Sequence, residues 1–226
     1  ALGVRDSNEA SWTQILEVLE FMADATSIPL LVDGDTGSET AAGTALMVQA
    51  FEAAGAAAVH IEDQALPKKC GHLDGKTLID PIAMAEKIAA GIAARRHLYI
   101  IARTDAAANE GLDGAIARAQ LYLEAGADAI FPEALTSADM FRAFAAQIDA
   151  PLLANMTEFG KTPIFTAPEF QEMGYSMLIW PSPAFRVAAK AQGELYGALI
   201  RDGGSHNMLE RMQTRDELQD LIGDGA

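Results

Sequence analysis

The sequence repeats one pattern along most of its length: a short apolar run ends in polar or charged residues, and an alanine-rich helical segment follows. Nearly continuous apolar strands that alternate with helices are typical of a parallel sheet covered by helices on both faces. The pattern therefore predicts an α/β protein of six strand–helix units. The runs that we expect to be strands are residues 28–35, 57–63, 98–105, 129–134, 150–157 and 176–181.

Amphipathic segments separate these runs, as expected for the helices between parallel strands. Two of them close on a glycine just before the next strand, in EAAGAAAVHIED and EAGADAIFPE, which is a signal for the end of a helix. Because the composition does not change along the chain, residues 1–226 are predicted to form one domain. The predicted helices span about residues 11–25, 40–54, 81–95, 112–125 and 137–148.

Two architectures fit the alternation, a doubly wound sheet and a (β/α)8 barrel. A doubly wound dinucleotide fold usually has a G-x-G-x-x-G turn after its first strand, and DGDTGSET at 33–40 lacks that spacing. Polar residues stand instead at the C-terminal ends of many strands, and such ends converge on one place in a barrel. The sequence therefore predicts a (β/α)8 TIM barrel that is two units short. The strand-end residues are Asp33, Asp35, Glu62, Asp63, Arg103, Asp105, Glu133, Asn155 and Thr157.

Charge and composition exclude several classes of function. The net charge is −16, which argues against a nucleic-acid backbone as partner because no basic cluster offsets it. No apolar run approaches the roughly 18–20 residues that span a bilayer, and no basic-then-apolar secretory signal opens the sequence. The single cysteine suits a reducing cytosol. We therefore expect a cytoplasmic protein that acts on a small molecule.

Three carboxylates at neighbouring strand ends have the ligand chemistry of a hard cation. Asp33 and Asp35 are one residue apart, so they point the same way along the strand and would repel each other without a cation. Glu62 ends the next strand. Oxygen ligands of this kind suit Mg²⁺, and Mn²⁺ as an alternative, better than Zn²⁺. The other explanation is that these acids only cap the helices that follow.

The stretch KKCGHLDGKT at 68–77 has two interpretations. Its tail resembles a phosphate-binding loop, but three residues lie between its glycines where such a loop has four. Its front places Cys70 between two lysines and His72, whose positive charge would favour a thiolate. A free cysteine is by default a small buried apolar residue. In a glycine-containing loop at the mouth of a barrel, the reactive thiol is the better interpretation.

Arg103 and Glu133 also follow apolar runs. An arginine at a barrel mouth can hold a carboxylate or enolate oxygen with two hydrogen bonds, or it can form a structural ion pair with a neighbouring acid. Asn155 and Thr157 are weaker candidates for donors to a substrate carboxylate. His60 alternates with apolar residues, so we expect it to be a hydrogen-bonded core histidine.

Together these motifs resemble one superfamily. VDGDTG, HIEDQ, KKCGH, ARTDA, FPEA, LANMTEFG and MQTRDEL follow one another as in the isocitrate lyase/phosphoenolpyruvate mutase superfamily, from residue 1 almost to the C-terminus. Within it the chain is most similar to the 2-methylisocitrate lyases, and the KKCGH cysteine, which the mutases lack, favours a lyase. The resemblance implies a Mg²⁺-dependent (β/α)8 barrel and a homotetramer that exchanges a C-terminal helix, here residues 182–201.

The resemblance also implies a role for individual residues. Asp33 and Asp35 match the metal-binding aspartates, and Glu62 matches the acid that reaches the metal through water. Cys70 matches the acid/base cysteine, and Arg103 matches the arginine on the pyruvate-like oxygens. Lys68 and His72 are matched as further catalytic residues of a flexible gating loop, and Gly71, Glu133, Asn155 and Thr157 as substrate-binding residues.

The implied reaction is cleavage of 2-methylisocitrate, or a close 2-hydroxy or 2-keto di- or tricarboxylate, to pyruvate and succinate through an enolate, with Cys70 as general acid. Alternatives are a 2,3-dimethylmalate-type lyase, an oxaloacetate hydrolase, a phosphonate P–C bond enzyme and, from another class, a non-catalytic binding relative. Two features depart from the superfamily. Its members have a helix, two strands and a Ser-Gly-Gly segment ahead of the first residue here, and DGDTGSET replaces their aromatic–glycine pair.

Overall fold

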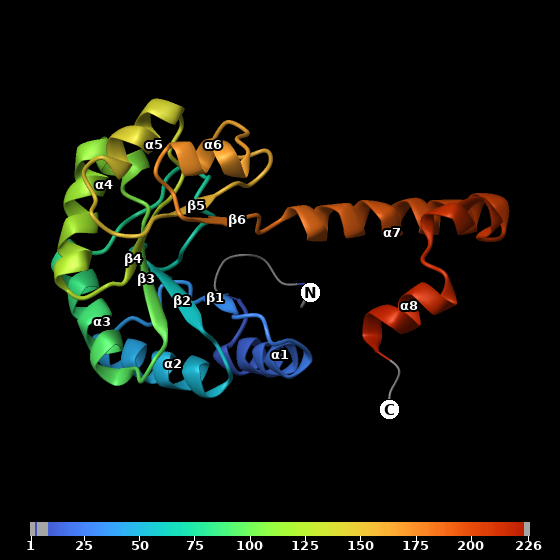
Figure 1. Cartoon of the computed structure of the whole chain (residues 1–226), viewed down its shortest axis with the longest axis horizontal. Helices are drawn as coiled ribbons and strands as arrows, with labels where there is room; N and C mark the ends of the chain where they lie inside the picture. The colour runs from blue at the N-terminus through green and yellow to red at the C-terminus, as the bar shows by residue number, and fades with distance from the viewer. Residues whose placement is uncertain (1–2, 4–8, 224–226) are drawn as a thin grey trace. The chain divides into compact units, whose positions relative to one another are not determined.

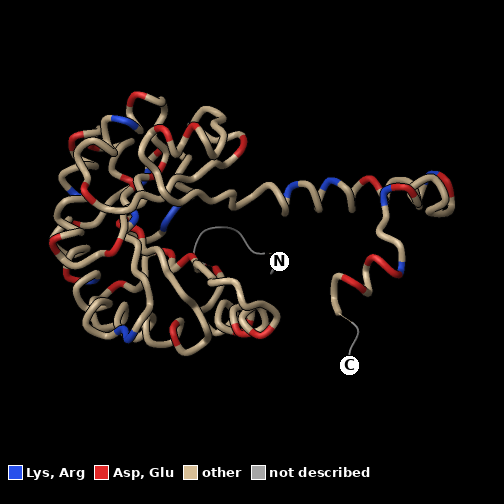
Figure 2. Tube along the Cα trace, in the orientation of Figure 1, with Lys and Arg blue, Asp and Glu red and all other residues tan. Residues whose placement is uncertain are grey.

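The computed structural model describes residue 3 and residues 9–223, and the chain divides after Trp180 into two compact units. Unit 1 ends at Trp180 and contains the strands, with helices around them (Figure 1). Acidic residues are spread along its trace, with lysines and arginines between them (Figure 2). Among the described residues, no helix is both long enough and apolar enough to cross a membrane.

Unit 1 alternates strands with helices in the predicted way (Figure 1). Its strands are β1 (Leu31–Asp33), β2 (Ala58–Glu62), β3 (Tyr99–Thr104), β4 (Ala129–Pro132), β5 (Leu153–Asn155) and β6 (Met177–Ile179). Its helices are α1 (Trp12–Ala25), α2 (Ala41–Ala53), α3 (Pro81–Ala94), α4 (Ala107–Glu124), α5 (Ala138–Ala145) and α6 (Ala167–Glu172). Each predicted strand is confirmed. The short helix α6 is an addition, and α4 begins earlier than predicted and bends at Gly111.

Helix starts are fixed by side chains that cap the backbone. Ser11 and Gln14 form a capping box at the start of α1. Asp80 accepts a hydrogen bond from the N–H of Ile82, ahead of a helix that begins with Pro81. These side chains satisfy N–H groups that a helix leaves without partners in its first turn, and proline has no such group to satisfy.

Strand pairing is parallel throughout and follows the order of the chain. The strands β1 to β4 form one sheet and β5 and β6 form another, and a bridge between Ile130 and Leu152 joins the two. Parallel neighbours in chain order, each joined through a helix, are the arrangement of a (β/α) barrel wall. The predicted fold class is therefore confirmed, with a wall that runs from β1 to β6.

Side chains of each strand alternate between two faces. In β3, Ile100 and Ala102 pack in the large apolar cluster between strands and helices. Ile101 packs on the opposite face in a second cluster with Phe131. Because successive strand residues point to opposite faces, Arg103 continues the face of Ile101. The inner face thus changes from apolar to charged side chains where the strands end.

Unit 2 consists of α7 (Pro183–Asp202), the 3₁₀-helix η1 (His206–Arg211) and α8 (Arg215–Ile222). In the described part of the chain, α7 has one buried residue, Ala198, and η1 and α8 have none. Large apolar side chains such as Phe185 and Ile200 are exposed. The segment predicted for subunit exchange, 182–201, is therefore a helix with many exposed apolar side chains.

Candidate active site

The predicted strand-end residues gather on the inner face of unit 1. Asp33 ends β1 and lies opposite His60 in the sheet, and Glu62 ends β2 and lies opposite Arg103. Glu133 follows β4 directly, and its N–H continues the ladder by donating to β3. The strand period of two places each of these side chains on the same face.

A close contact between two backbones holds the DGD segment beside β2. Gly34 N–H donates to His60 O at 2.9 Å, and Glu62 N–H donates to Asp35 O at 2.8 Å. A Cβ at Gly34 would lie 2.8 Å from Val59 Cγ2 and 2.9 Å from His60 O, so only glycine permits this approach. The result is that Asp35 lies next to the end of β2.

Positive charge surrounds the two aspartates. The carboxylate of Asp35 forms an ion pair with the buried ammonium of Lys68, and Asp33 Oδ1 accepts the N–H of Asp35 at 2.8 Å. Burial by itself would raise the pKa of Asp33, but His60, Arg103 and Lys68 outweigh it and lower that pKa below its ordinary value. Asp33 is therefore kept as a carboxylate, the form that binds cations.

Glu62 is fully buried, and its two carboxylate oxygens accept no hydrogen bond within the described residues. Its ion-pair partner is Arg103, whose Nη1 lies 3.1 Å from Oε2. Burial raises the pKa of Glu62 to about 8 although Arg103 acts in the opposite direction. A buried carboxylate of this kind normally has water or an ion as its partner. It therefore fits the edge of a hydrated cation site.

The three predicted metal ligands come together only as a loose group. Within the residues that the structure describes, no three His, Cys, Asp or Glu side chains lie close enough to hold a metal directly. Mg²⁺ often takes only one or two protein carboxylates and keeps several waters, whereas Zn²⁺ needs three or four protein ligands. The chemistry of Asp33, Asp35 and Glu62 therefore suits a hydrated Mg²⁺ better than Zn²⁺.

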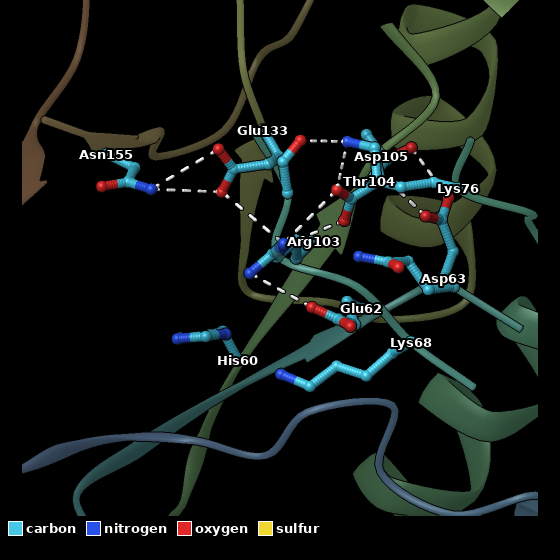
Figure 3. Close-up of polar contacts among 12 residues, drawn as sticks. His60, Glu62, Asp63, Lys68, Lys76, Arg103, Thr104, Asp105, Glu133 and Asn155 are labelled. Atoms are coloured by element: carbon cyan, nitrogen blue, oxygen red, sulfur yellow. Dashed lines mark hydrogen bonds and ion pairs between the residues drawn. The ribbon is translucent and has the colours of Figure 1, made fainter. Parts of the chain in front are cut away.

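Arg103 lies in the middle of an acidic cluster (Figure 3). Its guanidinium pairs with Glu62 at 3.1 Å, with Asp105 at 3.0 Å and with Glu133 at 3.7 Å. The group also lies over the ring of Phe131, 5.2 Å from its centroid. Burial alone would lower the pKa of Arg103, but the three acids raise it above its ordinary value. The structural ion pairs that the sequence offers as the alternative to substrate binding are present, and they hold the guanidinium in one orientation.

His72 connects Glu133 to the loop that carries Cys70. His72 Nε2 lies 2.9 Å from Glu133 Oε1, and the N–H of Lys161 donates to Nδ1 at 3.0 Å. Because Nδ1 accepts, the neutral ring carries its proton on Nε2 and donates it to Glu133. Asn155 Nδ2 donates to the same carboxylate at 3.3 Å. Burial alone would raise the pKa of Glu133, but Arg103 and these hydrogen bonds bring it to about 2.

The Cys70 loop packs directly on the strand-end residues. A Cβ at Gly71 would stand 2.6 Å from Arg103 Nη2 and would also overlap the side chain of Glu133. Only glycine allows the backbone this close to the guanidinium. Cys70, which precedes Gly71, is half-buried and free. The thiol-bearing residue is therefore adjacent to the residue that touches the cluster.

Two further residues named from the sequence are Thr157 and His60. Thr157 is buried past the end of β5, and within the described residues it is not among the groups that bond to Glu133. His60 is buried as predicted and packs edge-on against Phe131 at 5.5 Å. Its Nδ1 has no hydrogen-bond partner within the described residues. This nitrogen lies 3.5 Å from Asp33 Oδ1 instead.

A second layer of buried polar residues lies behind the site, and of these the sequence pattern singles out only Asp63 and Asp105, as polar residues at strand ends. Asp63 accepts four hydrogen bonds, from Thr104 Oγ1 at 2.8 Å, Tyr122 OH at 2.8 Å, the N–H of Asp105 at 2.9 Å and Arg118 Nη1 at 3.4 Å. Lys76 is also buried, and its ammonium lies 2.7 Å from Asp105. The signal for Lys76 is the GKT tripeptide, which the sequence offers only as an incomplete phosphate-binding loop.

Comparisons with known proteins agree on one family. The family model described as phosphoenolpyruvate phosphomutase matches residues 1–199. A 2-methylisocitrate lyase from Aeropyrum pernix is 47% identical over 223 residues, which are 99% of this chain and 72% of that protein.

Two solved structures show the same fold. A 2,3-dimethylmalate lyase of the PEP mutase/isocitrate lyase superfamily is 34% identical, with a TM-score of 0.92 over 98% of this chain and 75% of that one. A phosphonopyruvate hydrolase solved in complex with oxalate and Mg²⁺ is 32% identical, with a TM-score of 0.87 over 98% of this chain and 78% of that one. A protein of this fold therefore binds Mg²⁺ together with a small dicarboxylate.

Proposed function

The chain belongs to the phosphoenolpyruvate mutase/isocitrate lyase superfamily and is a carbon–carbon lyase of the methylisocitrate lyase kind, and we propose that it cleaves 2-methylisocitrate to pyruvate and succinate with Mg²⁺. The observation that supports this most is the position of the Cys70 loop. Its Gly71 packs on Arg103, so the residue that carries the thiol is next in sequence to the residue that touches the guanidinium.

The substrate carries three carboxylates, so its site must supply positive charge. Arg103 is held by three acids and does not have to reorganise when charge develops on the substrate. Asp33 and Asp35 would hold Mg²⁺, with Glu62 acting through water. When bound, the ion would polarise the substrate's oxygens and neutralise negative charge on them.

Cleavage breaks the bond between the hydroxyl-bearing carbon and its neighbour. The hydroxyl passes its proton to a water molecule, and its oxygen becomes the keto oxygen of pyruvate. The electron pair of the broken bond passes to the other fragment as an enolate. The thiol of Cys70 then gives its proton to that carbon as general acid, which completes succinate. Arg103 stabilises the negative charge that develops during the step.

The loop also has to exclude water, because water would protonate the enolate in place of Cys70. His72 bridges Glu133 and the N–H of Lys161, so it joins the Cys70 loop to two other segments of unit 1. We assign His72 a role in closing the site and Lys68 a role in carrying positive charge to Asp35. Glu133 and Asn155, with Thr157 beyond them, form the substrate pocket in this proposal.

We extend the proposal to the assembly, a homotetramer of single barrel domains with C-terminal helices. The exposed apolar side chains of α7, among them Phe185, Val187 and Ile200, support an exchange of this helix between subunits, because soluble proteins seldom leave such side chains uncovered together. A reducing cytosol stays the predicted compartment, since the chemistry needs Cys70 as a free thiol. Sedimentation of the intact protein measures the number of subunits.

A 2,3-dimethylmalate-type lyase is the second candidate. The fold match to a 2,3-dimethylmalate lyase favours it, with a TM-score of 0.92. That reaction also forms a keto acid and an enolate fragment, so it would use Arg103 and Cys70 in the same way. The two candidates differ in the carboxylates and side group that the pocket must accept.

The test is pyruvate release by the full-length protein from 2-methylisocitrate, with and without Mg²⁺, in the wild type and in Cys70→Ser. We expect turnover that requires Mg²⁺ and falls about 10²- to 10⁴-fold in the variant, with little change in KM. Turnover of 2,3-dimethylmalate alone would replace the substrate and keep the lyase. Binding of Mg²⁺ without turnover of either compound, oxaloacetate or phosphonopyruvate would establish a non-catalytic relative.

A further inference from the structure

The lysine of the GKT tripeptide is buried beneath the loop that carries Cys70. Only 1% of the Lys76 side chain is exposed. Its ammonium donates to Asp105 Oδ1 at 2.7 Å and to the carbonyl oxygen of Gly71. A buried ammonium destabilises a fold unless it is paired and hydrogen-bonded. The two partners of Lys76 therefore offset the cost of burying its ammonium.

The first partner, Asp105, serves two cations at once (Figure 3). Its Oδ2 accepts from Arg103 Nε at 3.0 Å, and its Oδ1 accepts from Arg103 Nη2 at 3.3 Å as well as from Lys76. The backbone of Asp105 is fixed in turn, because its N–H donates to Asp63 at 2.9 Å. One immobilised carboxylate therefore sets the positions of both the guanidinium and the ammonium.

The second partner lies next to the thiol. Gly71 follows Cys70 and packs against Arg103 with no room for a side chain. The position of the Gly71 carbonyl therefore fixes where Cys70 lies. Lys76 connects that carbonyl to the same carboxylate that orients Arg103.

The rest of the loop is fastened at its two ends and also at its middle, where His72 meets Glu133 and the N–H of Lys161. Gln64 donates to Lys69 O at 2.8 Å and accepts the N–H of Lys69 at 3.0 Å. Asn109 Nδ2 donates to Lys76 O at 2.8 Å. Residues 70–75 lie between these anchors, and the Lys76 ammonium is a tie from the rear anchor to the residue beside the thiol.

We propose that Lys76 is a positioning residue of the site. Its ammonium holds the Gly71 carbonyl, and Cys70 with it, in register with Arg103 through their shared partner Asp105. If Lys76 only neutralised Asp105, removing its ammonium would leave the position of the Cys70 loop unchanged. The catalytic purpose of this arrangement rests on the proposed function, whereas the tie itself does not.

The experiment uses the single cysteine as a reporter of loop position. Alkylation of Cys70 by iodoacetamide is timed on the folded full-length protein, at the alkaline plateau of the rate where the thiol is ionised in every variant. Lys76→Met should be alkylated about tenfold faster than the wild type, because losing a charge-assisted hydrogen bond raises the population of open loop.

Lys69→Met is the matched control. It removes an exposed ammonium of the same loop, one that donates to Gly75 O at 2.9 Å, and it should leave the alkylation rate at the wild-type value. Lys76→Arg restores the charge and should bring the rate most of the way back. Melting temperature does not separate the explanations, since both a tie and a neutralising partner would lower it.

An unchanged alkylation rate in folded Lys76→Met would overturn the proposal and leave Lys76 as a neutralising partner of Asp105. Where Lys76→Met does not fold, Lys76→Gln keeps a polar group in its place and carries the same expected and contrary results. In the lyase assay, Lys76→Met should lower kcat about tenfold with a smaller change in KM. A wild type without lyase activity would contradict the proposed function and leave the alkylation result standing.

Discussion

In unit 1, acidic side chains near the N-terminal ends of the strands have hydrogen-bond partners that an acidic side chain at the C-terminal ends lacks. At the N-terminal ends, Glu52 accepts hydrogen bonds from the backbone N–H groups of residues 96–98, at 2.6 to 3.0 Å. Asp128 is held there by both terminal nitrogens of Arg95. At the C-terminal ends, Glu62 is fully buried and accepts no hydrogen bond within the described residues.

The difference separates stability from function. A carboxylate that is saturated by backbone N–H groups has no capacity left for a ligand, and it joins the end of one element to the start of another. A buried carboxylate that lacks such partners destabilises the fold and is available to water, a cation or a substrate. In a barrel of this kind the C-terminal end of the strands is the functional one.

The largest effect, on lyase turnover, should come from an arginine-to-lysine substitution, which we compare at the C-terminal and N-terminal ends of the strands. Arg103→Lys keeps the charge but loses the planar fork that serves three acids, so lyase turnover should fall about 10²- to 10³-fold. Arg95→Lys loses the two-nitrogen contact with Asp128 and should lower the melting temperature while turnover stays near the wild-type value. Pyruvate release and thermal unfolding measure the two results. Equal losses of turnover would break the comparison between the ends.

An intermediate effect is expected at Glu52. Burial by itself would raise its pKa, but the N–H groups of residues 96–98 outweigh it and lower the pKa below its ordinary value. A lowered folded-state pKa stabilises the fold above the unfolded pKa, about 4.3 for glutamate, and this stabilisation is lost as the pH falls through the folded value. Glu52→Gln should therefore lower the free energy of unfolding by about 1–2 kcal/mol at neutral pH.

Urea unfolding at about pH 7 and about pH 3, on either side of the carboxylate range, measures this difference. The gap between wild type and Glu52→Gln should close in acid. Glu20→Gln, on the exposed surface of α1, is the control and should show no gap at either pH. A gap of the same size at both pH values would mean that the charge of Glu52 is not what stabilises the fold.

The smallest effect on stability is expected at Glu62. The raised pKa of Glu62, about 8, means that the fold must take up a proton there at neutral pH. Glu62→Gln removes this cost and leaves Arg103 paired with Asp105 and Glu133. The free energy of unfolding should rise by a few tenths to about 1 kcal/mol, while Mg²⁺-dependent turnover falls. Urea unfolding at neutral pH and the lyase assay measure the two. A clear loss of stability would place Glu62 with the structural acids of the opposite end.

The sequence predicts the parts of the site that strand periodicity governs. Asp33, Glu62 and Arg103 end apolar runs, and a period of two places them on one face once the strands are parallel. Their arrangement therefore follows from the pattern alone. The choice of substrate and the tetramer do not follow from it and remain predictions.

The contacts of the loop are beyond such a prediction. Lys76 meets Asp105, and His72 meets Lys161, across long separations in the sequence. A single side chain in a loop has no period that shows which way it points. The GKT tripeptide marks Lys76 as unusual, but only the path of the loop shows that its ammonium turns inward.

The strand order has a consequence for how the protein is made. The pairings of β1 with β2, β2 with β3, β3 with β4 and β5 with β6 each join a strand to the one synthesised just before it. Each pairing therefore closes over a single crossover, and folding can advance with translation. The strand that carries Glu62 is therefore synthesised before the strand that carries its partner Arg103, and the ion pair can form as soon as β2 and β3 pair.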